Sequence, residues 1–340
     1  MFDNQVLIDD IKMLGCHNLW QKLSGRTLLI TGATGMLGSY LALAANEANI
    51  YGGYGIKLIL LGRNSKKAKL LFDSINCKII SQDIREPLNI NEPVHYIMHT
   101  AGPVGPKIFD NDPLDVISAN VEGTFSLLRY AMQYECQSIA YASTHEVYGK
   151  VDGEQTEASM SGVVDTTNPR SSYVLAKQTT ENILSCFSKQ YGIKTSSARL
   201  SRLYGPLMNL SSGLFVCDFI KDAIQRKPVR VRGDLNLIRP LCYITDAAKA
   251  MLHILINAKM GEAYNVQGDE LPTIGEIADL ISSIGGCPVQ ENKPETREYQ
   301  RSGHWLNTDK LRELKWQQDV KLFDGLKRTY EYFIQAGGSE

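Results

Sequence analysis

Short apolar segments of strand length recur through the first two-thirds of this chain, and longer segments with helical periodicity separate them. We expect strands at residues 26–31, 56–61, 78–82, 95–100, 138–143 and 195–200. The segments between them, such as 116–134 and 173–191, are long enough for crossover helices. This alternation predicts an α/β fold in which helices cover both faces of a parallel sheet, with ligands at the carboxyl ends of the strands.

The pattern differs at the two ends of the chain. Apolar residues at positions 6, 7, 8, 11 and 14 recur at helical spacing and predict an N-terminal helical extension over 1–24. After residue 200 the elements become shorter, and glycine and proline pairs such as Gly205-Pro206 separate them. We therefore expect one domain from 25–200 plus about 240–266, and a smaller lobe from 201–239 plus 267–340.

Three glycines at the spacing G-x-x-G-x-x-G follow the first expected strand, and a helix-forming stretch over 39–47 comes next. A strand, a tight turn and a helix N-terminus together bind phosphate, because backbone N–H groups and the helix dipole point at the anion. Gly32 would allow the turn, Gly35 would let a pyrophosphate approach the backbone, and Gly38 would let the helix pack on the strand. The same glycines also suit an ordinary α/β turn, so other residues of the chain are needed to show whether this turn binds a cofactor.

Composition narrows the function classes. The chain has 340 residues, of which 43% are hydrophobic and 21% charged, and its net charge is -1. These values are ordinary for a globular protein and give no sign of a nucleic-acid or membrane partner. Acidic rather than basic residues lie near the N-terminus, so we expect no export signal.

Seven cysteines are scattered without a Cys-x-x-Cys pair, which suits reduced thiols in the cytoplasm.

His95 and His99 are four residues apart, but on a strand about 13 Å would separate them. We expect these histidines to be sheet residues near the cleft, and no metal site.

Tyr173 and Lys177 are four residues apart, a spacing that puts both side chains on one face of a helix. An ammonium near a phenol lowers the phenol pKa, so Tyr173 could act as a base nearer neutral pH. Thr144, just after an expected strand, could share the hydrogen bond of a substrate hydroxyl that Tyr173 deprotonates.

These features belong to a longer series of motifs. Residues 142–149 read Ala-Ser-Thr-His-Glu-Val-Tyr-Gly, residues 199–206 read Arg-Leu-Ser-Arg-Leu-Tyr-Gly-Pro, and Asn120 lies between them and the glycine turn. With these segments the chain resembles the extended short-chain dehydrogenase/reductases, of the NAD-dependent epimerase/dehydratase family, that modify nucleotide sugars. Residues 239–246 and Lys315-Trp316 match later segments of that family, so the resemblance spans roughly residues 25–320.

The resemblance implies a Rossmann-type doubly wound sheet that binds NAD(P)(H), and a C-terminal lobe that binds a nucleoside-diphosphate sugar. It implies a homodimer through 116–134 and 173–191, and catalytic roles for Thr144, Tyr173 and Lys177. The residues that it places at the cofactor are Gly32, Thr34, Gly35, Met36, Leu37, Gly38, Arg63, Asn64, Asp83, Ile84, Ala101, Gly102, Asn120, Tyr173 and Lys177. Those that it places at the substrate are Pro103, Arg202 and Arg239.

Among the branches of this family, the chain looks most like the UDP-glucuronate decarboxylases. The shared segments are 85–88, the proline-bearing loop 101–106, Glu146 and 168–170. Two residues depart from the pattern. His145 stands where the decarboxylases have serine and the 4,6-dehydratases have aspartate as an acid, and it could be a proton carrier or a space-filling residue. Arg202 stands where many relatives have asparagine near the diphosphate.

The expected reaction begins with oxidation at the sugar C4, where Tyr173 takes the hydroxyl proton. The 4-ketone then permits decarboxylation, dehydration or epimerisation, and Glu146 could act as a base at C5 or position the C6 group. In a dehydratase, His145 would protonate the leaving 6-hydroxyl. The alternatives are an NADPH-dependent 4-ketosugar reductase and, from another class, a non-catalytic sensor of dinucleotides or nucleotide sugars.

The loop after the second expected strand bears on the choice of cofactor. An acid there usually binds the ribose 2′-hydroxyl of NAD. Here residues 62–67 read Gly-Arg-Asn-Ser-Lys-Lys, so Arg63 and Lys66 could instead hold a 2′-phosphate, or could simply be solvated. We therefore expect NADP(H), with NAD as the alternative.

Overall fold

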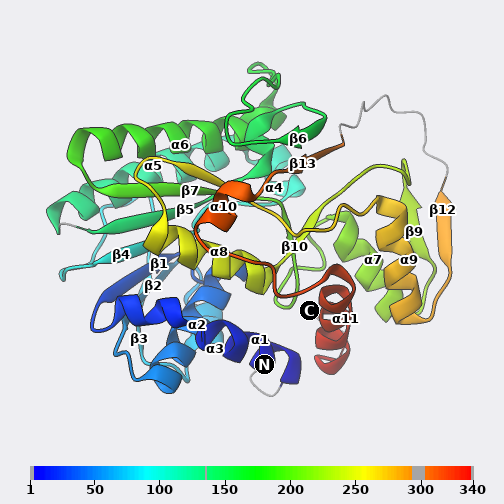
Figure 1. Ribbon diagram of the computed structural model, residues 1–340, viewed down its shortest axis with the longest axis horizontal. Coiled ribbons are helices and arrows are strands. Elements are labelled where there is room, and N and C mark those ends of the chain that lie inside the picture. The colour runs from blue at the N-terminus through cyan, green and yellow to red at the C-terminus, as the bar shows by residue number, and fades with distance from the viewer. Residues whose placement is uncertain (1–3, 135, 293–302, 338–340) are drawn as a thin grey trace.

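A seven-stranded sheet forms the centre of the larger lobe in the computed structural model, which describes residues 4–134, 136–292 and 303–337 (Figure 1). The strand order is β11-β7-β5-β4-β1-β2-β3, and every neighbouring pair is parallel. The strands are β1 (Thr27–Thr31), β2 (Lys57–Gly62), β3 (Cys77–Ser81), β4 (Tyr96–His99), β5 (Ser138–Thr144), β7 (Lys194–Leu200) and β11 (Ala263–Val266). The predicted parallel sheet is confirmed, and this is a Rossmann-type α/β fold.

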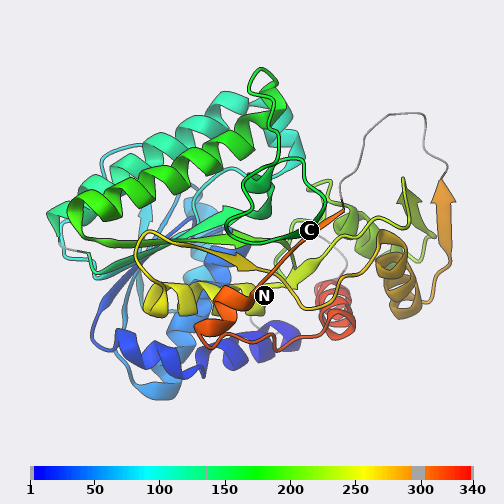
Figure 2. The same ribbon diagram turned by 45° about the horizontal axis from the view of Figure 1, so that its top comes forward.

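Helices cover both faces of the sheet, as Figures 1 and 2 show from two directions. One face carries α5 (Pro113–Gln133) and α6 (Ser172–Tyr191), which pack against each other. The other carries α2 (Met36–Gly52), α3 (Ser65–Phe72) and α8 (Ile244–Asn257). The central strands β1 and β5 are buried along their whole length, as expected for strands covered on both faces.

The N-terminal segment forms α1 (Gln5–Gly15) and the 3₁₀ helix η1 (Asn18–Leu23). The side chain of Asn4 caps α1 by accepting a hydrogen bond from the backbone N–H of Leu7. Val6, Leu7 and Leu14 are buried against the body, where α1 contacts α2, α8 and the C-terminal helix. The buried face follows from the helical spacing of these apolar residues.

The elements after β7 pair segments that are far apart in the chain. β8 (Arg202–Tyr204) pairs with β10 (Leu241–Tyr243), and β9 (Val229–Arg232) pairs with β12 (Val289–Asn292). The helices of this part are α7 (Phe215–Ile224), α9 (Ile274–Gly285) and α11 (Leu322–Gln335). Near the larger lobe, β13 (His304–Leu306) pairs with β6 (Gly153–Gln155), and α10 (Asp309–Glu313) contacts β11.

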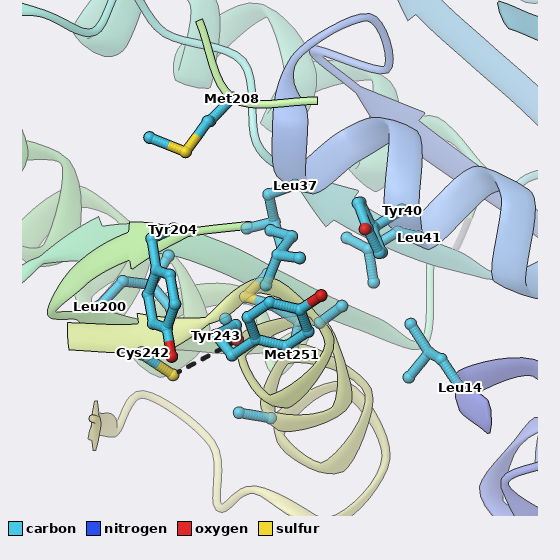
Figure 3. Packing of buried hydrophobic residues seen from close by; sticks show 14 of the residues in the cluster. Leu14, Leu37, Tyr40, Leu41, Leu200, Tyr204, Met208, Cys242, Tyr243 and Met251 are labelled. Atoms are coloured by element: carbon cyan, nitrogen blue, oxygen red, sulfur yellow. Dashed lines mark hydrogen bonds between the residues drawn. The ribbon is translucent and has the colours of Figure 1, made fainter. Parts of the chain in front are cut away.

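One hydrophobic cluster runs without a break from the sheet into the smaller lobe (Figure 3). Leu37 and Leu41 of α2 and Met251 of α8 lie near Tyr204 and Tyr243 of β8 and β10. The two tyrosine rings meet edge to face with centroids 5.4 Å apart. This shared core holds the strand ends of the larger lobe against β8 and β10.

Three further short elements lie in the described residues: α4 (Pro106–Asn111), η2 (His145–Tyr148) and η3 (Pro169–Ser171). All three lie in connections that follow β4 or β5 at the carboxyl edge of the sheet. None of the helices in the described residues is long and apolar enough to cross a membrane.

Candidate active site

The turn between β1 and α2 has the geometry that a bound pyrophosphate needs. Gly32 has φ +66°, and a Cβ there would lie 2.7 Å from the backbone of Ala101. A Cβ on Gly38 would lie 2.4 Å from the carbonyl oxygen of Gly32, so the helix must begin close to the strand. Gly35 caps α2 without a side-chain hydrogen bond, and its neighbours Met36 and Leu37 start the helix. The first amides of α2 therefore remain available to an anion.

A pocket of about 550 Å³ lies beside this turn. Thr34, Gly35 and Met36 line it from the turn, together with Lys67 of α3, residues 207–210 and the end of α11. The glycine cradle and the uncapped helix fit the diphosphate of a nicotinamide dinucleotide.

Tyr173 and Lys177 lie one turn apart on α6, and both side chains are buried. The Tyr173 ring stacks on Phe109 of α4 with centroids 4.4 Å apart, and its hydroxyl lies near that of Thr144 at the end of β5. Burial, and then the charge of Glu146, raise the pKa of Tyr173, while the Thr144 hydroxyl lowers it. In the protein alone the phenol is therefore held in its neutral form.

The ammonium of Lys177 donates a hydrogen bond of 2.8 Å to the backbone carbonyl of Ala142. It also lies 4.5 Å from the centre of the Tyr141 ring and 5.7 Å from that of Tyr173. Burial lowers the pKa of Lys177 to about 7, against the opposing effect of Glu181 one turn further along α6. Lys177 can thus gain or lose a proton near neutral pH.

Glu146 follows in η2, where its backbone N–H donates to the hydroxyl of Thr144 over 3.2 Å. Burial raises the pKa of the Glu146 carboxyl, and the charges of Arg202 and Arg170 lower it. Arg202 lies on β8 and Arg239 just before β10, so the two paired strands bring both guanidinium groups to this side of the site. The charges of both arginines also lower the pKa values of His145 and His304.

His145 lies between Thr144 and Glu146 and is 6% exposed. Its Nδ1 is 3.1 Å from the backbone carbonyl of Leu200, which can only accept, so Nδ1 carries the proton. Burial lowers the pKa of His145 well below its ordinary value, and Arg202, His304 and Arg239 lower it further. The residue is therefore a neutral imidazole whose Nε2 is a hydrogen-bond acceptor. This state does not suit the expected role of an acid for a leaving hydroxyl.

The residues expected at the cofactor in the loops after β2 and β3 include an ionic cluster. The carboxylate of Asp83 accepts hydrogen bonds from the backbone and guanidinium of Arg85, whose second branch reaches Asp115 at 2.7 Å. Arg85 lowers the pKa of Asp83. Arg63 is only loosely attached, 3.8 Å from Asp83 and 3.9 Å from Asp115, and its side chain is 59% exposed. Asn64 caps α3 by accepting from the N–H of Lys67.

The other residues expected at the cofactor or the substrate follow β3 or β4, or lie on α5. Ala101, Gly102 and the buried Pro103 follow β4, and a Cβ on Gly102 would lie 3.0 Å from Oδ1 of Asn120. Asn120 is fully buried and donates to the backbone carbonyl of Val116 within α5. Ile84 is buried against α5.

His95 and His99 lie at opposite ends of β4. His99 is buried at the end of β4, where its ring bonds Thr31 and Thr124. His95 precedes β4 at the amino edge of the sheet and accepts from the N–H of Thr27, so it is far from the carboxyl edge. The prediction that His95 lies near the cleft was wrong, because the strand begins one residue after it.

Three further residues border the site, and the sequence pattern missed two of them, Phe109 and His304. Phe109 supports the Tyr173 ring, and the guanidinium of Arg170 lies 4.8 Å from the centre of the Phe109 ring. His304 of β13 lies beside His145. No motif marks Phe109 or His304, while Arg170 belongs to the segment 168–170 already noted.

The chain matches the model of the NAD dependent epimerase/dehydratase family over residues 28–266. UDP-glucuronic acid decarboxylase 1 of Danio rerio is 27% identical over 318 residues, covering 91% of this chain and 72% of that protein. UDP-glucuronic acid decarboxylase 6 of Arabidopsis thaliana is 27% identical over 321 residues, covering 91% and 89%.

Solved structures show the same fold. UDP-glucose 4-epimerase from Thermotoga maritima, with UDP-glucose, superposes with a TM-score of 0.79 at 24% identity, covering 91% of this chain and 99% of that one. UDP-glucuronic acid 4-epimerase from Bacillus cereus, in complex with UDP-glucuronic acid and NAD, gives 0.77 at 22% identity, covering 91% and 99%.

Proposed function

Because this chain belongs to the NAD dependent epimerase/dehydratase family, we propose that it oxidises C4 of a nucleoside-diphosphate hexuronate and then decarboxylates the sugar. The observation that carries the proposal is the buried Tyr173, one helical turn from Lys177 on α6, with Thr144, Glu146 and Arg202 close by. The decarboxylases among the relatives support the choice of a hexuronate.

Tyr173 would take the proton of the sugar 4-hydroxyl, with Thr144 sharing the hydrogen bond and Lys177 stabilising the phenolate. The dinucleotide, when bound, accepts a hydride from C4 and can return it later. Since burial and the charge of Glu146 raise the pKa of Tyr173, the phenol can give up its proton only when positive charge, from Lys177 or the oxidised cofactor, comes close.

The 4-ketone makes loss of the C6 carboxylate possible. The C5–C6 bond breaks, carbon dioxide leaves, and the electron pair passes into the enolate of the ketone, which takes a proton at C5. Arg202 and Arg239 would hold the carboxylate before it leaves. Glu146, with its raised pKa, would hold the proton that C5 takes up.

The protonation of His145 favours decarboxylation over dehydration. Dehydration needs an acid for the departing 6-hydroxyl, and a neutral imidazole that donates Nδ1–H to a backbone carbonyl has no proton on its other nitrogen. Decarboxylation needs no such acid at C6.

The experiment is to incubate the purified protein with UDP-glucuronate and follow carbon dioxide and the sugar nucleotide by mass spectrometry. A UDP-pentose or UDP-4-ketopentose supports the proposal. Turnover of UDP-glucuronate without loss of carbon dioxide, or turnover of UDP-glucose to a 4-keto-6-deoxy sugar instead, contradicts it.

We also propose that the cofactor is NADP(H). Arg85 already makes short contacts to both Asp83 and Asp115, so Arg63 is free to turn toward a 2′-phosphate, and Lys67 lies near the turn. Mass identification of the dinucleotide released from the denatured protein decides between NADP(H) and NAD.

Two further expectations remain as proposals. Exposed apolar side chains on α5, among them Leu114, Ile117 and Phe125, support a homodimer through α5 and α6, which light scattering tests.

All seven cysteines are unpaired, which supports a reducing compartment such as the cytoplasm.

A further inference from the structure

The rings of His145 and His304 lie side by side, with centroids 5.3 Å apart and planes inclined by 31°. They come from η2, directly after β5, and from β13, more than 150 residues later in the chain. His145 is 6% exposed and His304 is 8% exposed. Two imidazoles from distant segments thus share one buried position next to Thr144 and Glu146.

Three of the four ring nitrogens have no hydrogen-bond partner among the residues that the structure describes. These are Nε2 of His145 and both nitrogens of His304. A buried polar atom without a partner costs about 1–3 kcal/mol, and most buried polar atoms in native proteins are paired. Three such atoms at one place therefore indicate a polar partner that the described residues do not supply.

The chemistry of these nitrogens defines the ligand. Nε2 of His145 is an acceptor, because Nδ1 donates to Leu200. Burial lowers the pKa of His304 to about 4, as do the charges of Arg202 and Arg239, so it is neutral at pH 7 and offers one donor and one acceptor. A group that both donates and accepts serves one nitrogen of each ring, and a hydroxyl does so with a single oxygen, which accounts for two of the three nitrogens.

A carboxylate does not fit this position. It offers only lone pairs, and these would face the lone pair of His145 Nε2. Arg202 and Arg239, which carry full positive charge, are the natural partners for the anionic parts of the same substrate.

We propose that His145 and His304 form a subsite that recognises a ring hydroxyl of the sugar next to C4, with His145 accepting from that hydroxyl and His304 donating to it. The inference rests on the proposed action on a nucleotide sugar, but not on decarboxylation. It makes His304 a specificity-determining residue, because a site built to bond a hydroxyl discriminates strongly against a sugar that lacks it.

The test uses the cofactor-bound protein carrying Tyr173→Phe, which prevents turnover, and measures binding by calorimetry. The probes are UDP, UDP-glucose and UDP-glucuronate, with dTDP and dTDP-glucose alongside. His304→Phe keeps a ring against His145 but removes both nitrogens, so binding of the sugar nucleotides should weaken about tenfold or more while binding of UDP or dTDP stays the same. His304→Gln, which restores a donor and an acceptor, should recover part of the loss.

The matched control is His253→Phe, since His253 is an equally buried histidine on α8, bonded to the carbonyl of Leu314 and outside the site. It should leave all binding constants unchanged. If His304→Phe does not fold, His304→Leu takes its place.

Equal weakening of the nucleoside diphosphates, or no weakening at all, overturns the inference. A selective loss for sugar nucleotides in a protein that never releases carbon dioxide leaves the subsite intact and contradicts only the proposed reaction. Decarboxylation with no selective loss contradicts only the subsite.

Discussion

At the scale of single residues, burial sets the protonation states of the site. It raises the pKa of Tyr173 and lowers that of Lys177 to about 7, so each group is pushed toward its neutral form. The cofactor's positive charge would then favour the phenolate only when the site is loaded.

The variant Tyr173→Phe tests this assignment. The Phe ring can keep the stacking on Phe109, so the fold and cofactor binding should persist, while turnover should fall about 10²–10⁴-fold because the proton acceptor is gone. Initial rates and the bound dinucleotide are measured on the same preparation. Tyr191→Phe at the exposed end of α6 is the control and should keep full activity. Retained turnover in Tyr173→Phe would remove Tyr173 from the mechanism.

At the scale of elements, one carboxylate ties α1 to three parts of the fold. Asp10 is fully buried and accepts hydrogen bonds from the hydroxyls of Tyr40 in α2, at 3.0 Å, and Tyr243 in β10, at 2.6 Å. Its other oxygen accepts from Arg328 of α11 at 2.7 Å. The N-terminal helix is therefore joined to both lobes by a polar contact inside an otherwise apolar interface.

Removing the Asp10 carboxylate should destabilise the fold. Asp10→Ala leaves two buried hydroxyls and one guanidinium without their acceptor, and should lower the free energy of unfolding by about 3 kcal/mol. Urea denaturation monitored by circular dichroism measures it. Asp9→Ala is the matched control, because Asp9 is exposed on the same helix and bonds only Gln5 among the described side chains. Its effect on the free energy of unfolding should stay within about 0.5 kcal/mol. Equal effects of the two substitutions would argue against the role given to Asp10.

At the scale of the whole molecule, the histidines make stability depend on pH. The chain has six, and burial lowers the pKa of every one. The lowering reaches about 3 for His99 and about 4 for His253 and His304. The unfolded chain therefore binds more protons than the folded one below about pH 6.5, and stability falls as the pH falls.

We expect the free energy of unfolding to drop on the order of 4 kcal/mol between pH 7.5 and pH 5.5, with four buried histidines contributing. Asp246, whose pKa burial raises to about 6, opposes part of this change because its folded form takes up a proton in the same range. Urea midpoints at the two pH values measure the drop, and His253→Gln should reduce it by roughly a quarter. A midpoint that is constant or rises toward pH 5.5 would contradict this account.

The sequence by itself determined the elements and the chemistry that depends on short spacing. Six of the seven sheet strands follow from apolar runs; for all but the edge strand β3, which is not buried, the reason is that a strand covered on both faces needs such a run. The glycine turn and the one-turn separation of Tyr173 and Lys177 follow from spacing alone, since a helix converts four residues into one face. The seventh strand, β11, was missed as a strand because its sequence Ala-Tyr-Asn-Val includes the buried polar residue Asn265 and so does not read as an apolar run.

Only the tertiary structure decided which distant residues meet and in which protonation state. No pattern in the sequence links His145 to His304, because their contact depends on the parallel pairing of β13 with β6. The carbonyl of Leu200, at the end of another strand, selects the tautomer of His145, and depth in the molecule sets the pKa of Lys177. Solvation and hydrogen bonding across the chain are properties of three-dimensional surroundings, which local spacing does not encode.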